Sequence, residues 1–466
     1  MTSTPDLPPK PPSRADRVSL WRYMRLFRQD ILSAQPARLY RAWMAEFRTP
    51  FFRSYMINQP ALIDEVLKAR PMDFPKSDRV GEGLRPLLGR SVFLTNGAEW
   101  QRQRRIIDPA FEGGRLRDTF PAIWAAGKAA VSRIGATNGN APCEIEAEMS
   151  HAAADVIFRT LFSLPIEDQV ASEVFHLFRA YQRTQPILNA AAFLPLPRWM
   201  PRGHRAETRR TAAAIRTLIT QMTAARMAEI EAGTAPDDLA TKIMTTADPE
   251  TGQRFTTEEM VDQVAIFFLA GHETSASTLA WTLYLLARYP EWQDKLAQEA
   301  ETALTEAPDF AVMGKLRLAR DIFRETLRLY PPVPMMVRET TCTESFRARN
   351  LTRGSQIVIS PWHLHRHERL WENPDGFDPA RWQTENGKTC LREAFIPFSA
   401  GARVCTGAGF AMVEGPLLLA MLVRAYRFAP VADRVPMPVA YLTVRAKDGI
   451  WLNITPRQAA GDEHAR

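Results

Sequence analysis

The chain has 466 residues, of which 45% are hydrophobic and 24% are charged. This balance is that of a soluble globular protein, and it excludes disordered, collagen-like and multi-span membrane proteins. A net charge of +7 would suit a nucleic-acid partner. However, residues 1–60 hold ten basic and four acidic side chains and so account for +6 of this net charge. The remaining residues are near neutral, so we expect no nucleic-acid partner.

The N-terminal region changes character near residue 18. Residues 1–17 are polar and rich in proline, which predicts a disordered arm. Residues 19–32 have apolar side chains at helical spacing, with Arg22, Arg25 and Arg28 elsewhere around the helix. Such a helix either touches an anionic membrane surface or docks on the body of the protein, and its sequence leaves both open.

The middle of the chain is mostly helical. We expect a strand at 51–57, a helix at 60–69, a long loop at 73–96 and mainly helices from 99 to 232. A loop as long as the one at 73–96 usually has a functional role.

A capping box at Thr256 and Glu259 opens a long helix that runs to Pro290. This stretch is the most apolar of its length, but it carries His272 and Glu273 at its middle. A buried helix of a soluble protein explains that better than a membrane span does.

The C-terminal third alternates helices and short strands. Helices are expected at 316–330 and 409–426, and strands at 356–360, 440–443 and 449–454. No β-α-β alternation is present, so the predicted fold class is mainly α with small β-sheets.

The four cysteines, Cys143, Cys342, Cys390 and Cys405, show no C-x-x-C spacing, which argues against a zinc ribbon. Four cysteines in so long a chain do not resemble a disulfide scaffold, and no N-terminal apolar run could serve as a signal peptide. We therefore expect a cytoplasmic protein.

Cys405 differs from the other cysteines because it lies just before a helix N-terminus, where unpaired N–H groups stabilise a thiolate. Gly401 and Gly407 allow tight turns and a close approach to a flat cofactor, and Arg403 could pair with a carboxylate. The plainer interpretation is a buried free cysteine in a turn. A dinucleotide-binding turn is excluded, since no strand precedes it and position 412 is methionine.

The segment from Phe398 through Cys405 to Gly407 fits the pattern F-x-x-G-x-R-x-C-x-G at every fixed position. It resembles the haem-binding loop of the cytochrome P-450 family of haem-thiolate monooxygenases. The resemblance extends over about residues 20–457. It implies a single triangular P-450 fold over 18–457, with haem b between the long helix and the Cys405 loop, and a flexible tail at 458–466.

The family resemblance also covers a charged network. Glu325 and Arg328 resemble the E-x-x-R motif, and Arg381 lies in a segment like P-x-R-F in which Trp382 replaces phenylalanine. The resemblance implies that Glu325, Arg328 and Arg381 form a buried network that holds the fold beneath the haem. We regard these three residues as structural, not catalytic.

The long helix carries Ala270, Gly271, His272, Glu273 and Thr274, which match the family's A-G-x-[DE]-T motif. The resemblance places Ala270 and Gly271 at the cofactor, where the helix leaves room for dioxygen. It assigns Thr274 to hydrogen-bonding the activated oxygen and Glu273 to relaying protons, which is general acid work. The plainer interpretation is a helix that tolerates weak helix formers, and His272 is not expected to be an iron ligand.

By the same resemblance, Trp100, Arg104, Arg338 and Arg403 hold the haem propionates, and Phe398 and Gly407 flank the cofactor. Cys405 is the iron ligand, and its thiolate favours O–O cleavage. One departure concerns 47–60, where the family usually has a strand–turn–strand hairpin and this chain looks several residues short.

The implied reaction inserts one oxygen atom from O2 into a lipophilic molecule such as a fatty acid, alkane or terpenoid. No flavin or ferredoxin domain follows the haem loop, so a ferredoxin or flavodoxin with its reductase is expected to supply electrons. Arg102, Arg105 and Lys388 are candidate docking charges for that partner, and we expect a monomer. The alternatives are a peroxide-using or hydroperoxide-isomerising enzyme, and a haem carrier or sensor without catalysis.

Overall fold

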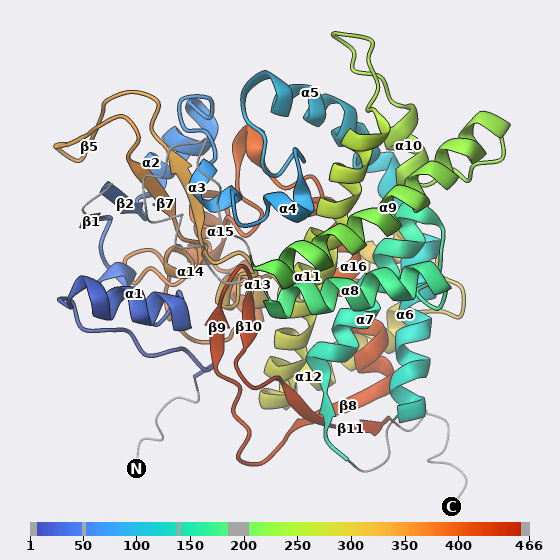
Figure 1. The fold of residues 1–466 in the computed structure, drawn as a ribbon. Helices are drawn as coiled ribbons and strands as arrows, with labels where there is room; N and C mark the ends of the chain where they lie inside the picture. Colours follow the sequence, from blue (N-terminus) through green and yellow to red (C-terminus); the bar gives the residue numbers. More distant parts are fainter. Residues whose placement is uncertain (1–6, 49–52, 138–140, 185–204, 458–466) are drawn as a thin grey trace, which may run out of the picture.

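The computed structural model describes residues 7–48, 53–137, 141–184 and 205–457 (Figure 1). The predicted tail at 458–466 and residues 1–6 of the predicted arm lie outside these ranges. Helices dominate, and small sheets lie mainly to one side of them. The predicted class, mainly α with small β-sheets, is confirmed.

The helices follow one another along the described chain with few long loops. Their bounds are α1 (Leu20–Gln29), α2 (Pro60–Asp64), α3 (Asp78–Gly81), α4 (Arg85–Leu88), α5 (Gly97–Ile107), α6 (Gly113–Thr137), α7 (Ile145–Phe162), α8 (Gln169–Thr184), α9 (Ala206–Ala232), α10 (Leu239–Thr245), α11 (Thr257–Arg288), α12 (Pro290–Ala303), α13 (Arg317–Leu329), α14 (Pro361–Leu364), α15 (Glu385–Glu393) and α16 (Ala408–Ala425).

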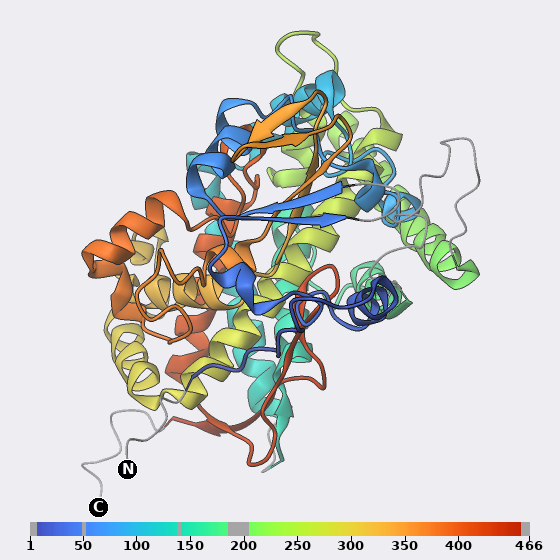
Figure 2. The ribbon, with the colours of Figure 1, turned by 90° about the vertical axis from the view of Figure 1, so that its left-hand side faces the viewer.

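The strands form four small sheets. Their bounds are β1 (Met44–Arg48), β2 (Arg53–Ile57), β3 (Cys143–Glu144), β4 (Met336–Glu339), β5 (Glu344–Phe346), β6 (Arg349–Leu351), β7 (Gln356–Ile359), β8 (Tyr426–Pro430), β9 (Pro438–Ala440), β10 (Val444–Ala446) and β11 (Trp451–Pro456). The largest sheet has the order β1-β2-β7-β4, in which only β2 and β7 are parallel. Figure 1 shows it to the left of the helices, and Figure 2 shows the β1–β2 hairpin from that side.

The long helix α11 runs through the centre of the helical part. Thr256 caps it with the predicted capping box, and it is 32 residues long. It packs on α7, α9, α13 and α16, so most of its side chains are buried. A helix that is apolar on all sides requires such surroundings. By length and composition α16 could also span a membrane, but 67% of it is buried inside the protein, as in a core helix.

Two predicted details change in the structure. The hairpin that the sequence put in doubt is present, with Met44 paired to Ile57 and Arg48 to Arg53. The strand expected at 440–443 is instead mostly a turn between β9 and β10. The turn forms because Ala440 pairs with Val444, which leaves only three residues to reverse the chain.

The N-terminal arm is attached to the body from residue 7 onward. Lys10 bonds Asp375 at 2.6 Å, and the Tyr330 hydroxyl donates to the Pro9 carbonyl at 2.9 Å. Residues 7–17, for which composition predicts disorder, therefore run along the protein surface in contact with it. Helix α1 has no buried residues, and Trp21 on it is 81% exposed.

Candidate functional site

Cys405 lies in a tight loop whose shape depends on glycine. Gly401 has a φ of +65°, and a Cβ at this position would lie 2.1 Å from the Leu67 carbonyl oxygen, so another residue would clash. The Cys405 N–H donates to the Phe398 carbonyl at 2.9 Å, and α16 begins three residues later. The loop therefore presents the thiol in a fixed position at the start of α16.

The thiol of Cys405 is exposed although dense protein surrounds its loop. Burial raises its pKa, while a hydrogen bond from the Gly407 backbone and the charge of Arg104 act in the opposite direction. The sequence predicts a thiolate stabilised by the helix end alone, but desolvation is the larger effect here. A thiolate at this position needs the charge of a bound metal, which deprotonates a coordinating thiol.

Beside Cys405 lies a group of cations around one indole ring. We call Lys76, Arg104, Arg338 and Arg403 the cation cluster. The guanidinium of Arg403 lies 4.3 Å from the centroid of the Trp100 ring, that of Arg104 lies 5.9 Å away, and the Lys76 ammonium lies 6.0 Å away. The sequence predicts Trp100 and the three arginines at one site, and the structure brings them together.

Among the described residues, two members of the cation cluster, Arg338 and Arg403, lack a matching anion. Arg104 pairs with Asp108 at 2.8 Å, but the Arg338 Nε and the Arg403 Nε and Nη1 are buried without a hydrogen-bond partner. Burial and mutual repulsion lower the pKa of Arg338 and of Arg403 to about 10, and that of Lys76 well below its ordinary value. Buried cations without partners are costly, so the site is suited to bind anionic groups.

The middle of α11 presents two open positions. Ala270 is exposed and Thr274 is half-buried, whereas Leu269 and Glu273 next to them are buried. The Thr274 hydroxyl donates to the Ala270 carbonyl at 2.6 Å. Gly271 lies on the side of α11 that packs against α7, because a Cβ at this position would lie 2.4 Å from the Ile157 side chain. Helix packing thus requires this glycine, which the sequence motif alone attributes to the cofactor.

Glu273 is buried and held by side chains from two other elements. Its Oε1 accepts from the Thr443 hydroxyl at 2.5 Å and from the Arg445 guanidinium, with Nε at 3.0 Å. Its Oε2 accepts from the Gln182 amide on α8 at 3.2 Å. Among the described residues, no hydrogen bond joins Glu273 to Thr274, so the two members of the predicted pair face different partners.

His272 is a packing residue, as the sequence indicates. Its Nε2 shares a hydrogen bond of 2.6 Å with the Ser150 hydroxyl, and its ring meets Phe175 edge-on. Burial lowers its pKa to about 3, so the ring is neutral.

The Glu325 network forms as the motifs imply. Glu325 and Arg328 are fully buried and joined at 2.7 Å, and Arg381 Nε lies 3.2 Å from the same carboxylate. Arg328 also donates to three backbone carbonyls, those of His365, Pro374 and Gly376. The network satisfies its own charges and contributes no open group.

Comparison with known proteins identifies the arrangement. The model of the family described as cytochrome P-450 matches residues 42–451. The chain belongs to the cytochrome P-450 family. It is 31% identical over 435 residues to the cyclooctat-9-en-7-ol 5-monooxygenase of Streptomyces melanosporofaciens, which covers 92% of this chain and 90% of that protein. It is 32% identical over 401 residues to the cyclooctatin synthase of the same organism, with 84% of each chain covered.

A solved structure agrees in fold. The haem domain of cytochrome P-450DA aligns with a TM-score of 0.80 at 23% identity, covering 97% of this chain and 98% of that one. The predicted P-450 fold is thereby confirmed, and the protein is a cytochrome P-450 monooxygenase. Its family cofactor is haem.

The residues present fit a haem. Its iron needs a protein ligand, and the exposed Cys405 thiol would be a soft donor of the required kind. Its two propionates need cations, and the cation cluster supplies buried guanidinium groups without partners of their own. When bound, the haem supplies the oxygen-activating chemistry of the family.

The candidate docking charges of this P-450 are already paired. Arg102 bonds Glu259 at 2.6 Å, Arg105 bonds Asp248 at 2.5 Å, and Lys388 bonds Glu385 at 2.9 Å. These pairs neutralise the charges that the sequence offers to an acidic electron carrier. The acidic partners of Arg102 and Arg105 lie far away in the sequence, so the sequence alone does not show that these two arginines are paired.

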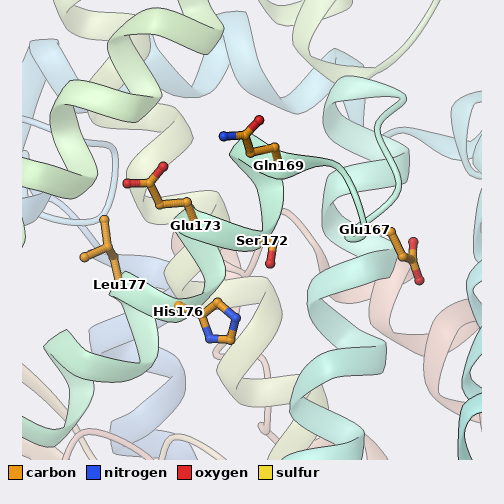
Figure 3. A pocket seen from close by; sticks show the side chains of 6 residues that line it. All are labelled: Glu167, Gln169, Ser172, Glu173, His176 and Leu177. Atoms are coloured by element: carbon orange, nitrogen blue, oxygen red, sulfur yellow. The ribbon is translucent and has the colours of Figure 1, made fainter.

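A shallow hollow of about 500 Å³ lies at the start of α8, away from the haem motifs (Figure 3). Its side chains are mostly polar, and they are Glu167, Gln169, Ser172, Glu173, His176 and Leu177. None of them belongs to the Cys405 loop, the cation cluster or the open part of α11.

The sequence assigns no individual role to four residues of this site, although the family resemblance includes two of them, Lys76 and Thr443, in the segments 73–96 and 441–443 that are expected to line the pocket. Lys76 lies in the 73–96 loop. An isolated antiparallel β-bridge places it opposite Arg338, and no sequence pattern indicates this pairing. Thr443 and Arg445 reach Glu273 from 170 and 172 residues away. Glu414 lies nine positions after Cys405 and is buried, but nothing in the surrounding sequence indicates a buried acid there.

Proposed function

We propose that this cytochrome P-450 binds haem b and inserts one oxygen atom from O2 into a lipophilic molecule, with cyclic terpenoids as the first candidates. The observation that carries the proposal is the open pair Ala270 and Thr274 on α11. This helix is joined to α16, which begins three residues after Cys405, by the Ser275–Glu414 hydrogen bond of 2.7 Å. The names of the two Streptomyces relatives, which refer to cyclooctat-9-en-7-ol and cyclooctatin, support the substrate class.

In this proposal each residue has a defined task. Cys405 would supply a thiolate ligand to the haem iron, and the guanidinium groups of Arg104, Arg338 and Arg403 would hold the propionates beside Trp100. Thr274 offers a hydroxyl at the open face of α11, and Glu273 stores a proton one residue away. Phe398 and Gly407 flank the thiolate.

The pocket above Ala270 is proposed to be apolar. The segments expected to line it are the 73–96 loop, 266–270, 333–337 and 441–443. Phe93, Val333 and Tyr441 in these segments are large side chains left 37 to 44% exposed. Such side chains would suit a lipophilic ligand if they face one common surface.

Electrons are proposed to come from a separate ferredoxin or flavodoxin with its reductase, and the protein is proposed to be a cytoplasmic monomer. Helix α1, with its exposed Trp21 and its arginines, is a proposed contact for an anionic membrane. The domain limits are proposed as an arm at 1–17, a haem domain at 18–457 and a tail at 458–466.

The test begins with spectroscopy. The reduced carbon monoxide complex should give the spectrum of a thiolate-ligated haem, and Cys405→Ser should abolish it. A cyclic diterpene alcohol should shift the haem spin state at lower concentration than laurate does. The opposite order would refute the terpenoid assignment and favour fatty acids.

Turnover assays distinguish the two alternative functions from the proposed one. A ferredoxin, its reductase and NADPH should yield a hydroxylated product with O2. Product formed only with added peroxide would identify the peroxide-using alternative. Ligand binding without any consumption of reducing equivalents would identify a haem carrier or sensor.

A further inference from the structure

A basic hollow lies beside α1, in the part of the protein where the excess charge of the sequence is concentrated. It has a volume of about 490 Å³. Four arginines line it, and they are Arg14, Arg38, Arg41 and Arg369. We call this site the arginine hollow. It shares no residue with the Cys405 loop or the cation cluster, so the proposed function gives it no task.

Arg14 is held in place by the backbone around it. Its Nε donates to the Ala34 carbonyl at 2.6 Å, and its Nη1 donates to the Ala15 carbonyl at 2.7 Å. Its backbone N–H donates to the Gln35 carbonyl at 3.1 Å, and its guanidinium lies 5.5 Å from the centroid of the Tyr23 ring on α1. These partners are neutral, so they orient the guanidinium without cancelling its charge.

The acidic neighbours of the arginine hollow hold its arginines only weakly. Asp16 Oδ1 lies 3.8 Å from the Nε of Arg38, and both side chains are at least half exposed. The Glu368 carboxylate lies 3.2 Å from the Nε of Arg41, and these side chains are 45% and 64% exposed. Exposed ion pairs contribute little, because water solvates both partners. An anion that accepts several hydrogen bonds at once would therefore compete well with these carboxylates.

Two members of the arginine hollow, Arg14 and Arg369, form no ion pair among the described residues. The guanidinium of Arg369 lies 5.6 Å from the centroid of the Trp43 ring, which is a neutral partner. Burial lowers the pKa of Arg14, and the charge of Arg38 contributes to this. Four guanidinium groups therefore face two carboxylates, which leaves two positive charges without a counterpart.

Guanidinium groups in this arrangement suit a phosphate group. Each can donate two parallel N–H groups to two oxygens of one phosphate, and such charged hydrogen bonds are stronger than neutral ones. A phosphate monoester carries about −1.5 to −2 charges at pH 7, which matches the surplus in the hollow. The four arginines come from three segments, at 14, at 38–41 and at 369, so they line the hollow from several sides. A carboxylate, with one charge, would leave part of the surplus unmatched.

Helix α1 connects the arginine hollow to a surface that suits lipid. Its Tyr23 ring packs on Arg14, and Trp21 and Leu20 on the same helix are 81% and 42% exposed. Three further arginines lie along this helix. An exposed indole with nearby cations is typical of segments that lie on an anionic membrane. A phosphate held in the hollow would bring α1 to the layer of lipid headgroups.

We propose that the arginine hollow binds a phosphate monoester, carried either by an anionic lipid such as phosphatidic acid or by a soluble molecule. The four guanidinium groups would hold the phosphate oxygens, and Asp16 and Glu368 would turn toward solvent. The site goes beyond the proposed function, since it uses neither haem nor the surface around Ala270. In the lipid case, it would hold the protein on the membrane in one orientation.

The first test measures the binding of glycerol 1-phosphate to the full-length protein by calorimetry at low ionic strength, where charge screening is weak. The unchanged protein should bind one equivalent. Arg38→Gln together with Arg369→Gln should weaken binding about tenfold or more, because each removes hydrogen bonds between charged groups. Both side chains are exposed, so the fold should remain, and an unchanged midpoint of unfolding in denaturant checks this.

The matched control is Arg424→Gln together with Arg427→Gln. It removes the same charge from pairs with Glu301 and Asp294, outside the hollow. Its affinity for glycerol 1-phosphate should be nearly unchanged. Equal weakening in the two double variants would reveal a general effect of net charge and overturn the site, as would the absence of binding by the unchanged protein.

If R38Q/R369Q does not fold, Arg369→Gln alone decides the question, because this side chain has no ion pair within the described ranges. It should weaken binding several-fold and leave Arg14 and the arm in place. An affinity equal to that of the unchanged protein would contradict the proposal.

The second test distinguishes the two sources of phosphate. Vesicles of phosphatidylcholine with phosphatidic acid are compared with vesicles of phosphatidylcholine with phosphatidylglycerol at the same surface potential. If a lipid is the ligand, the protein should cosediment several-fold more with phosphatidic acid, and R38Q/R369Q should lose this preference but keep the binding due to α1. Equal binding to both vesicles, with glycerol 1-phosphate still bound, would assign the site to a soluble phosphate monoester. No binding of either probe would refute the site.

Discussion

Two regions of this protein bury arginines, and they differ in how the charge is satisfied. In the Glu325 network, Arg328 and Arg381 share one fully buried carboxylate and several backbone carbonyls. In the cation cluster, buried guanidinium nitrogens of Arg338 and Arg403 have no partner within the described chain. The comparison teaches that buried charge alone does not mark a binding site. A site is marked where the chain leaves the charge unsatisfied.

The largest expected effect comes from breaking the satisfied region. Glu325→Ala removes the shared anion and leaves two buried guanidinium groups, so unfolding in denaturant should require about 3–5 kcal/mol less free energy. Glu301→Ala is the control, because its pair with Arg424 is exposed and should cost under about 1 kcal/mol. Similar losses in the two variants would contradict the structural role of the network.

Glu414 represents a third way to bury a charged group, which is to neutralise it. Burial raises the pKa of Glu414 from its ordinary 4.5 to about 8, with the Ser275 hydroxyl acting against it. The folded chain then binds a proton that the unfolded chain has already lost between those values. Stability from this group is therefore complete below about pH 4.5 and is lost as pH rises to about 8.

Glu414→Gln should remove this dependence. The stability of the unchanged protein should fall by a few kcal/mol across that pH range relative to the variant, measured by denaturant titration at several pH values. Glu146 and the buried histidines are present in both proteins, so their titration cancels. A variant with the same pH dependence as the unchanged protein would show that Glu414 is ionised throughout.

A mutation in the cation cluster should affect the stability of the haem-free chain in the opposite way from a mutation in the Glu325 network. Arg403→Met removes a cation that has no partner of its own, so the haem-free chain should be no less stable. Haem release should become about 10 to 100 times faster, since one hydrogen bond to a charged group is worth about 1.5–3 kcal/mol. Haem transfer to an acceptor protein measures the rate, and destabilisation of the haem-free chain would refute the comparison.

The smallest effect is expected at Lys76. Burial, together with the neighbouring arginines, lowers its pKa well below the ordinary value, and a bound carboxylate should restore it. Haem binding should therefore take up a proton at any pH at which the Lys76 amine is neutral in the haem-free chain. Calorimetry in two buffers of different ionisation enthalpy would detect the uptake, and Lys76→Met should abolish it with little change in the stability of the haem-free chain.

The sequence predicted the local parts of this molecule well. The capping box at Thr256, the helix at 409–426 and the Glu325 motif each depend on residues within a few positions, and each appears in the structure. The strand expected at 440–443 was wrong, because pairing of Ala440 with Val444 forces a turn there. The role given to Gly271 was incomplete, because only the approach of Ile157 shows what the glycine accommodates.

The sequence by itself determined the family, and it indicated the proposed thiol ligand and three of the cations, because these residues occur in motifs with fixed spacing. Only the tertiary structure decided which charges are satisfied. Arg102 and Arg105 look free in the sequence but meet Glu259 and Asp248, whereas Arg403 does not meet an anion among the described residues. The reason is physical: partners of buried charges come from elements far apart in the chain, so only folding brings them within hydrogen-bonding distance.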